Sequence, residues 1–354
     1  MILSKTPFRI SFAGGGSDLP EFYRRRTGTV VSTTIDKSMY IAIHPYFHDK
    51  IRIKYSRTED VSEIAEIEHP LVRECLRMLN IGCGMEIASF ADVPAGTGMG
   101  SSSAFTVGLL HALHALAGRS VGPERLAEAA CRVEIERVAE PIGKQDQYAT
   151  AYGGLNAIRF HPDETVEVRP LACSPFTREE LGSRLMLFYI GQERAASSIL
   201  AEQARNMADA EKFGLVARMA DLAEELATEL EKNRLDSFGE ILHEGWELKS
   251  RLARDITNDA IESNYRRARE AGAEGGKILG AGGGGFLLLY AKREKQGQVR
   301  EALDHLREMP FAMSTEGSRL LCNDGQNEPI LARPAMSSAP GGCFLAESAG
   351  LRYP

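Results

Sequence analysis

The chain has 354 residues, of which 43% are hydrophobic and 26% charged, a length that allows about two domains with sizeable cores. The formal net charge of −7 argues against a nucleic-acid partner, because such surfaces need a basic field. The longest apolar run near the carboxyl end is too short to span a bilayer, and the first residues lack the layout of a signal peptide. We therefore expect a cytoplasmic globular protein without a nucleic-acid or membrane partner, and composition leaves a homo-oligomer open.

The first hundred residues are predicted to be mostly strands. Phe8, Ile10 and Phe12 alternate with polar or small residues, which indicates a half-buried strand. Further strands are expected at 30–35, 39–43, 51–55 and 85–90. A short helix is expected at 70–79, before the last of these strands.

Helices and strands then follow in blocks. Two helices are expected, from residue 103 to about 118 and from Gly122-Pro123 onward, and then a hairpin at 153–160 and 165–170. The remaining elements are predicted as a strand at 184–190, helices over 197–271 with breaks near Asn233 and Asn258, strands at 278–279 and 286–290, a helix at 294–308 and a strand at 311–314. Blocks of this kind predict two α+β domains and not a doubly wound sheet. We place them at 1–175 and 176–323, with the Pro/Gly/Ser-rich segment 324–354 as a peripheral, poorly ordered tail.

A glycine-rich stretch at 93–104 contains the strongest local signal. Gly96, Gly98 and Gly100 leave backbone N–H groups unshielded, and the helix that follows presents the positive end of its dipole. Such a junction favours phosphate, and the serines at 101–103 add hydroxyls for a cap, a phosphate oxygen or Mg²⁺. The alternative for this segment alone is an ordinary glycine turn with a serine cap.

Two other phosphate-loop motifs do not apply. Gly276-Lys277 is followed by Ile278, so the chain has no Walker loop. The Gly-x-Gly-x-x-Gly match at 280–285 leads into a strand-like segment, whereas a dinucleotide-binding loop opens a helix.

Glu134 is an independent candidate for a metal ligand. At helical spacing it shares a face with Ala127, Ala130, Cys131 and Val138. A carboxylate on an apolar face is costly unless it has a partner, and Mg²⁺ is a sufficient partner. The neighbouring Glu136 is expected to face solvent.

Three stretches together resemble the GHMP kinases, the family of galactokinase, homoserine, mevalonate and phosphomevalonate kinases. They are residues 7–18 (PFRISFAGGGSD), 94–104 (PAGTGMGSSSA) and 277–286 (KILGAGGGGF), in the family's order. The resemblance implies an α+β GHMP kinase fold, with an N-terminal α/β domain like ribosomal S5 domain 2 and a C-terminal ferredoxin-like domain. It places the active site between them and implies ATP and Mg²⁺ as cofactors.

The resemblance also implies site residues. Asp146, in Gly143-Lys144-Gln145-Asp146-Gln147, matches the catalytic aspartate of sugar-1-kinases, and Arg9 matches the arginine of the first motif; without the motifs, Asp146 would be read as a helix cap. Mg²⁺ is assigned to Ser102 and to Glu134, twelve residues before Asp146. ATP binding is assigned to Pro94, Gly96, Gly98, Met99, Gly100, Ser101, Ser102, Ser103, Gly282 and Gly283. Sugar binding is assigned to Gly15, Gly16, Ser17 and Asp18.

One departure from the galactokinase pattern concerns the sugar. Galactokinases carry Gly-Glu-His-Thr-Asp where this chain has residues 14–18, so Gly15 replaces the glutamate at the O6 end of the hexose. The change removes a negative charge and volume, which would admit a longer anionic substituent. Candidate cations are Arg24, Arg25, Arg26 and Lys37, although three consecutive arginines are also typical of a solvated face.

In these segments the chain is similar to the D-glycero-D-manno-heptose 7-phosphate kinases. The similarity implies phosphorylation of the anomeric hydroxyl to give the 1,7-bisphosphate, for nucleotide-activated heptose synthesis. An L-fucokinase-like or other sugar-1-kinase is the first alternative. A catalytically silent sugar- and nucleotide-sensing regulator on the same fold is the second.

Overall fold

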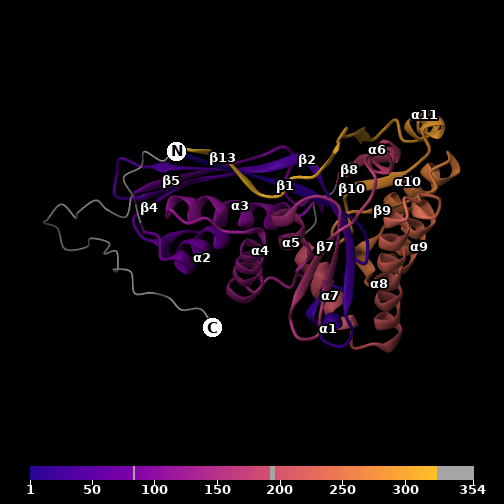
Figure 1. Cartoon of the computed structure of the whole chain (residues 1–354), viewed down its shortest axis with the longest axis horizontal. Helices are drawn as coiled ribbons and strands as arrows, with labels where there is room; N and C mark the ends of the chain where they lie inside the picture. Colours follow the sequence, from indigo (N-terminus) through magenta and orange to yellow (C-terminus); the bar gives the residue numbers. More distant parts are fainter. Residues whose placement is uncertain (83, 192–195, 325–354) are drawn as a thin grey trace, which may run out of the picture.

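The computed structural model describes residues 1–82, 84–191 and 196–324, so nearly all of the predicted tail lies outside the described residues. A large, mostly antiparallel sheet forms one half of the molecule (Figure 1). We call this the first half; it comprises residues 1–170 together with β12 and β13 from the end of the described chain, and the second half is the segment between them. Its strands are β1 (Ile2–Ala13), β2 (Gly28–Pro45), β3 (Ile51–Lys54), β4 (Thr58–Val61), β5 (Met85–Ala91), β6 (Asn156–Phe160), β7 (Val166–Pro170), β12 (Met313–Ser314) and β13 (Arg319–Asn323). The order is β13-β1-β2-β5-β3-β4, with β6 and β12 also pairing with β2, and β7 with β6. Only β3 and β5, among these described pairs, run parallel.

Helices cover one face of this sheet (Figure 1). They are α2 (Pro70–Leu79), α3 (Ser101–Leu116), α4 (Pro123–Cys131), the π-helix η2 (Arg132–Arg137) and α5 (Gln145–Tyr152), while the short α1 (Pro20–Tyr23) and η1 (Ile64–Glu66) lie in connections. Helix α3 approaches β1 closely, since a Cβ on Gly108 would lie 2.8 Å from Thr6 Oγ1. That close approach holds α3, the helix that follows the glycine loop, against β1, the strand that contains Arg9.

The second half contains a four-stranded antiparallel sheet in the order β11-β8-β10-β9. Its strands are β8 (Leu185–Gly191), β9 (Gly275–Ile278), β10 (Gly285–Tyr290) and β11 (Arg307–Glu308). This order agrees with the ferredoxin-like domain that the family resemblance implies. The helices are α6 (Pro175–Arg184), α7 (Ala196–Asn206), α8 (Ala210–Glu231), α9 (Phe238–Ser250), the 3₁₀ helix η3 (Arg254–Ile256), α10 (Asp259–Glu270) and α11 (Arg293–Ala302).

Three buried aromatic rings join the two halves. Phe12 of β1 meets Phe238 of α9 edge to face, with ring centroids 5.2 Å apart. Phe238 in turn lies 4.7 Å from Tyr290 of β10. Because all three rings are buried in one hydrophobic cluster, the orientation of the second sheet relative to the first depends on this contact.

Several predicted elements differ from the structure. The strands expected at 30–35 and 39–43 form the single strand β2, and the boundary expected between them is an irregularity in its pairing with β1, between Pro7 and Arg9. The helix expected at 294–308 stops at Ala302, and Arg307 and Glu308 pair with β8 instead. The predicted hairpin and the breaks near Asn233 and Asn258 are confirmed, while a further break before Asp209, which caps α8, is missed.

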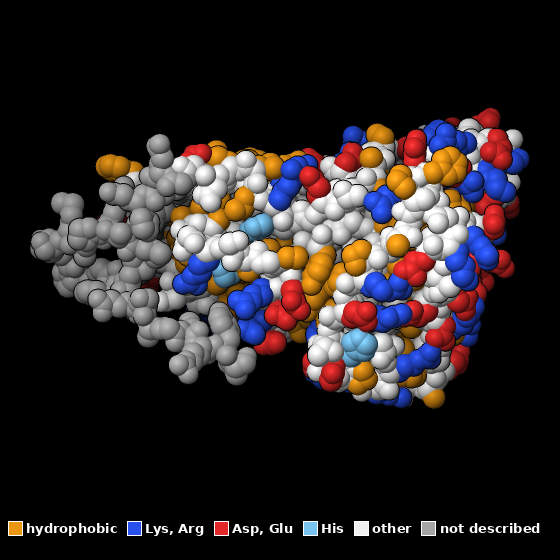
Figure 2. Space-filling view, in the orientation of Figure 1, with side chains coloured by type: hydrophobic (Ala, Val, Ile, Leu, Met, Phe, Trp, Pro, Cys, Tyr) orange, Lys and Arg blue, Asp and Glu red, His pale blue; other side chains and the backbone are white. Residues whose placement is uncertain are grey.

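The outer surface carries mixed charge. Figure 2 shows basic and acidic side chains interspersed over the second half, and ion pairs such as Arg218–Glu244 and Arg300–Glu308 account for part of this pattern. Among the described residues, no helix has both the length and the apolar character needed to cross a membrane.

The aromatic contact between the halves leads to a stability prediction. Phe238→Ala should lower the free energy of unfolding by about 3–5 kcal/mol, because it opens a cavity where the two sheets meet. Phe176→Ala is the matched control, since Phe176 is 77% exposed and should change the free energy by less than about 0.5 kcal/mol. Urea unfolding followed by circular dichroism measures both, and equal midpoints would contradict the role given to Phe238.

Candidate active site

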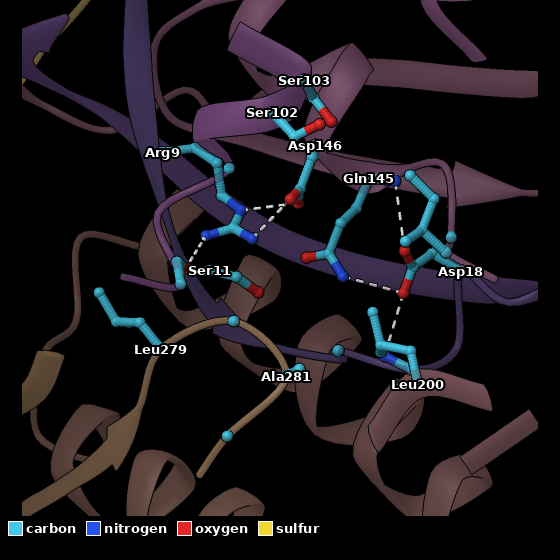
Figure 3. A pocket seen from close by; sticks show the side chains of 18 of the residues that line it. Arg9, Ser11, Asp18, Ser102, Ser103, Gln145, Asp146, Leu200, Leu279 and Ala281 are labelled. Carbon is cyan, nitrogen blue, oxygen red and sulfur yellow. Dashed lines mark hydrogen bonds and ion pairs between the residues drawn. The ribbon is translucent and has the colours of Figure 1, made fainter. Parts of the chain in front are cut away.

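A pocket of about 330 Å³ is lined by both halves of the chain, within the size range of small-molecule sites. The first half contributes β1, the loop after it, the glycine loop and the start of α5. The second half contributes α7, α9 and the segment from 277 to 284. Figure 3 shows Leu279 and Ala281 on one side of the pocket and Arg9 and Asp146 on the opposite side.

Arg9 and Asp146 form a two-bonded ion pair in this pocket (Figure 3). Arg9 Nε donates to Asp146 Oδ1 at 2.7 Å, and Nη2 donates to Oδ2 at 2.8 Å. The Asp146 side chain is 24% exposed, so its oxygens remain accessible from the pocket. Lys144, and not Asp146, occupies the cap position of α5, and the carboxylate is engaged by Arg9. The helix-cap alternative for Asp146 is therefore not what the structure shows.

Asp18 is the second carboxylate of the pocket. It accepts hydrogen bonds from the Gly16 N–H at 3.0 Å and from Gln145, whose N–H lies at 3.2 Å and whose Nε2 lies at 2.9 Å. Burial, followed by the negative charge of Asp146, raises the pKa of Asp18. Gly143 leaves room for this carboxylate, because a Cβ there would lie 1.9 Å from Asp18 Oδ2.

The glycine loop turns at three glycines with positive φ angles. Gly96, Gly98 and Gly100 have φ angles of 75°, 80° and 72°, which favour glycine, and Gly100 caps α3. The loop touches the third glycine-rich segment directly, since a Cβ on Gly280 would lie 2.4 Å from Gly98 Cα. Its backbone also contacts β1, because Arg9 N–H donates to Met99 O at 3.1 Å and Arg9 Nη1 donates to Gly98 O at 2.6 Å.

Most residues assigned to nucleotide and sugar line this pocket. They are Gly15, Gly16, Asp18, Gly96, Gly98, Gly100, Ser101, Ser102, Ser103 and Gly282. Four others lie outside its lining: Ser17, Pro94, Met99 and Gly283. Ser17 is buried, and its hydroxyl is hydrogen-bonded to Gly14 O of the loop and to the backbone of Thr29 on β2.

Glu134 lies directly behind the glycine loop. It is fully buried and accepts hydrogen bonds from Ser102 Oγ at 2.9 Å, Ser103 Oγ at 2.8 Å and Thr106 Oγ1 at 3.0 Å, and from Gln147 Nε2. Burial raises the pKa of Glu134, and these donors act in the opposite direction.

The residues near Glu134 fit a magnesium ion in their chemistry. Mg²⁺ prefers oxygen ligands, and the Glu134 carboxylate and the Ser102 hydroxyl are already neighbours. The π-helix η2 sets the direction of Glu134 and leaves Glu136 exposed, as predicted. Ser102 lines the pocket and Glu134 does not, so a metal here would sit at the back of the loop.

The pocket also contains polar residues that sequence reasoning missed. Ser11 Oγ, Gln145 Oε1 and Gln203 Nε2 are buried and have no hydrogen-bond partner within the described part of the chain. Such groups suit a polyhydroxylated ligand, because unpaired buried polar atoms are costly. Lys249 and Lys277 also line the pocket.

The cations proposed for an anionic substituent are engaged elsewhere. Arg24 pairs with Glu164, Arg26 pairs with Asp221, and Lys37 pairs with Asp36. Arg25 donates to a main-chain carbonyl and stacks on a phenylalanine ring. None of the four is among the described residues that line the pocket.

The fold and the pocket together are those of a small-molecule phosphotransferase. Two family models match the chain: GHMP kinases N terminal domain over residues 70–154, and GHMP kinases C terminal over residues 226–307. A mevalonate kinase from Methanothermobacter thermautotrophicus is 30% identical over 62% of this chain and 68% of its own length. The chain therefore belongs to the GHMP kinase family.

Two further proteins are similar over most of the chain. The D-glycero-alpha-D-manno-heptose 7-phosphate kinase of Campylobacter jejuni is 26% identical over 85% of this chain and 93% of its own length. The crystal structure of a D-glycero-D-manno-heptose 1-phosphate kinase from Bacteriodes thetaiotaomicron superposes with a TM-score of 0.74 and 25% identity, covering 90% of this chain and 98% of that one.

The contact between Gly143 and Asp18 can be tested. Gly143→Ala should displace the Asp18 carboxylate and raise the KM for the acceptor at least ~10-fold, with the KM for ATP within about 3-fold of wild type. Gly122→Ala is the matched control, because a Cβ there meets nothing within 4 Å. An unchanged acceptor KM in Gly143→Ala would show that Asp18 does not bind the acceptor.

Proposed function

We propose that the protein transfers the γ-phosphoryl group of ATP to the anomeric hydroxyl of D-glycero-D-manno-heptose 7-phosphate, forming the 1,7-bisphosphate. One observation carries the proposal: the Arg9–Asp146 pair, Asp18 and the open position at Gly15 share one pocket with the glycine loop. The similarity to a heptose 7-phosphate kinase over 85% of the chain supports the same substrate class.

In this proposal Asp146 accepts the proton of the acceptor hydroxyl. Arg9 orients the carboxylate through its two hydrogen bonds and adds positive charge near the transferred group. Asp18, whose position Gln145 and Gly16 fix, accepts hydrogen bonds from ring hydroxyls. The exposed N–H groups of the glycine loop and the start of α3 bind the phosphates of ATP.

Glu134 and Ser102 would hold Mg²⁺ at the back of that loop. When bound, the ion neutralises part of the phosphate charge and orients the oxygens around the transferred phosphorus. Ser103, Thr106 and Gln147 keep the Glu134 carboxylate oriented.

The open space at Gly15 is an argument for an anionic substituent on the sugar. A Cβ at this position meets nothing within 4 Å, and its φ angle lies outside the left-handed region that Gly14 and Gly16 occupy. The absence of a side chain is therefore not required by the backbone, and it leaves space and removes a negative charge where the far end of the substrate would lie.

The function is tested by measuring ADP release with a panel of sugars. Wild type should use heptose 7-phosphate at least ~10-fold better in kcat/KM than unphosphorylated heptose, galactose or fucose. Galactose and fucose belong in the panel because galactokinases and fucokinases are also among the similar proteins. Gly15→Glu should lower kcat/KM for heptose 7-phosphate at least ~10-fold, or about 1.4 kcal/mol, and lower it less for the unphosphorylated sugars.

Gly122→Glu is the matched control for charge and size, because Gly122 also has open space but lies outside the pocket lining. Equal or better turnover of galactose or fucose by wild type would refute the substrate. Equal losses on all sugars in Gly15→Glu would refute the anionic-end argument.

The role of Asp146 gives a separate prediction. Asp146→Asn keeps the size of the side chain but removes the base, so kcat should fall by ~10²–10⁴ with a modest change in the KM for ATP. Rapid-quench measurement of the chemical step distinguishes this loss from slow product release. Activity within a few-fold of wild type would exclude Asp146 as the base.

A further inference from the structure

Lys249 is a buried cation that the motifs do not include. It extends from α9 into the pocket, is 5% exposed, and donates from Nζ to Gly280 O in the third glycine-rich segment. An ammonium group has three donors, and within the described part of the chain this carbonyl is its one acceptor. No described carboxylate forms an ion pair with it.

The charges around Lys249 belong to the reacting centre. Burial and the positive charge of Arg9 lower its pKa to about 8, while Asp18 and Asp146 act in the opposite direction. These groups come from β1, the loop after β1, and α5. Lys249 therefore remains mostly protonated at neutral pH.

Lys277 of β9 provides a contrast. It is equally buried and donates to Phe12 O at 3.3 Å. Burial, with the charges of Lys249 and Arg9, lowers its pKa well below the usual value, and no carboxylate offsets that effect. Of the two buried lysines, Lys249 is the one that keeps its charge in the pocket.

We propose that Lys249 is a further catalytic residue, whose ammonium binds the non-bridging oxygens of the phosphoryl group during its transfer from ATP to the acceptor. The proposal rests on the phosphoryl transfer described above but not on the identity of the sugar. Lys249 lines the same pocket as Asp146 and the glycine loop, and its ammonium is hydrogen-bonded to Gly280 O of the third glycine-rich segment.

Arg9 has few N–H donors left for the phosphoryl oxygens. Three of its five N–H donors are already used, two by Asp146 and one by Gly98 O. Two donors of Lys249 have no acceptor among the residues that the structure describes, so they can bind oxygens entering the pocket. The phosphoryl group spreads negative charge over three oxygens in the transition state, and a second cation stabilises that charge.

The step balances without a proton from Lys249. The acceptor oxygen forms a bond to the γ-phosphorus, and its proton passes to Asp146. The bond from that phosphorus to the β–γ bridging oxygen breaks, and ADP leaves with the electron pair. Lys249 stays protonated throughout.

The test compares Lys249→Met and Lys249→Arg with Lys212→Met. Lys212 is a suitable control because it too donates to a main-chain carbonyl, Arg251 O at 2.7 Å, but outside the pocket lining. On whichever sugar wild type phosphorylates, Lys249→Met should lower kcat at least ~10²-fold, with both KM values within about 3-fold of wild type. Lys249→Arg should recover part of the loss, and Lys212→Met should behave as wild type.

A pH profile and a binding measurement separate this role from a structural one. Lys249 loses its charge as pH rises through about 8, so kcat of wild type should fall above that pH. In Lys249→Arg the fall should move to higher pH, because the guanidinium stays charged. In calorimetry, Lys249→Met should weaken the complex of ADP, aluminium fluoride and sugar at least ~10-fold more than it weakens binding of ADP alone.

Two outcomes in Lys249→Met would overturn the proposal. One is a kcat for Lys249→Met within about 3-fold of wild type. The other is a selective loss of affinity for sugar phosphate with kcat retained, which would make Lys249 a ligand of the distal phosphate. If Lys249→Met does not fold, an unchanged alkaline limb in Lys249→Arg would overturn it instead. Failure of the heptose assignment appears separately, in the wild-type sugar panel.

Discussion

The site depends on the set of contacts that Arg9 makes. From one position on β1 it binds the carboxylate of Asp146 on α5 and the Gly98 carbonyl of the glycine loop, and its own N–H holds Met99. The same loop touches Gly280 of the second half through backbone alone. β1, the glycine loop and α5, which are distant in the sequence, therefore meet at the guanidinium of Arg9. The planar fork of arginine makes these contacts simultaneously, which a lysine in its place would not do.

The pocket contains an unusual concentration of buried charge. Asp18, Lys249 and Lys277 are nearly inaccessible, and each has a pKa displaced toward its neutral form. Burial of charge opposes folding, so the arrangement costs stability. The aromatic contact of Phe12 and Phe238, which lies at the same junction of the halves, contributes in the opposite direction. We interpret the junction as a place where apolar packing offsets the cost of a reactive site.

Much of this could be predicted from the sequence, because the motifs are local and their backbones are restricted. The sequence singles out Glu134 by its place on an apolar helix face, and the structure brings Ser102 Oγ within 2.9 Å of its carboxylate, while its role as a metal ligand stays a prediction. The same argument would have found Lys249, which shares a face of α9 with Leu242 and Trp246 at helical spacing. The arginines at 24–26 illustrate the limit: a run of like charge does not tell which carboxylates, distant in the sequence, will pair with it.

The order of strands in the large sheet has a consequence for synthesis of the protein. β1 lies between β2 and β13, and β13 leaves the ribosome some three hundred residues later. Until then, residues 2–5 of the first strand, which are the ones that pair with β13, have unpaired N–H and C=O groups along one edge, and these can pair with another chain. This part of the strand that carries Arg9 is thus made long before its partner strand β13. A nascent chain would need a chaperone, or transient shielding by its own later segments, to protect that edge during translation.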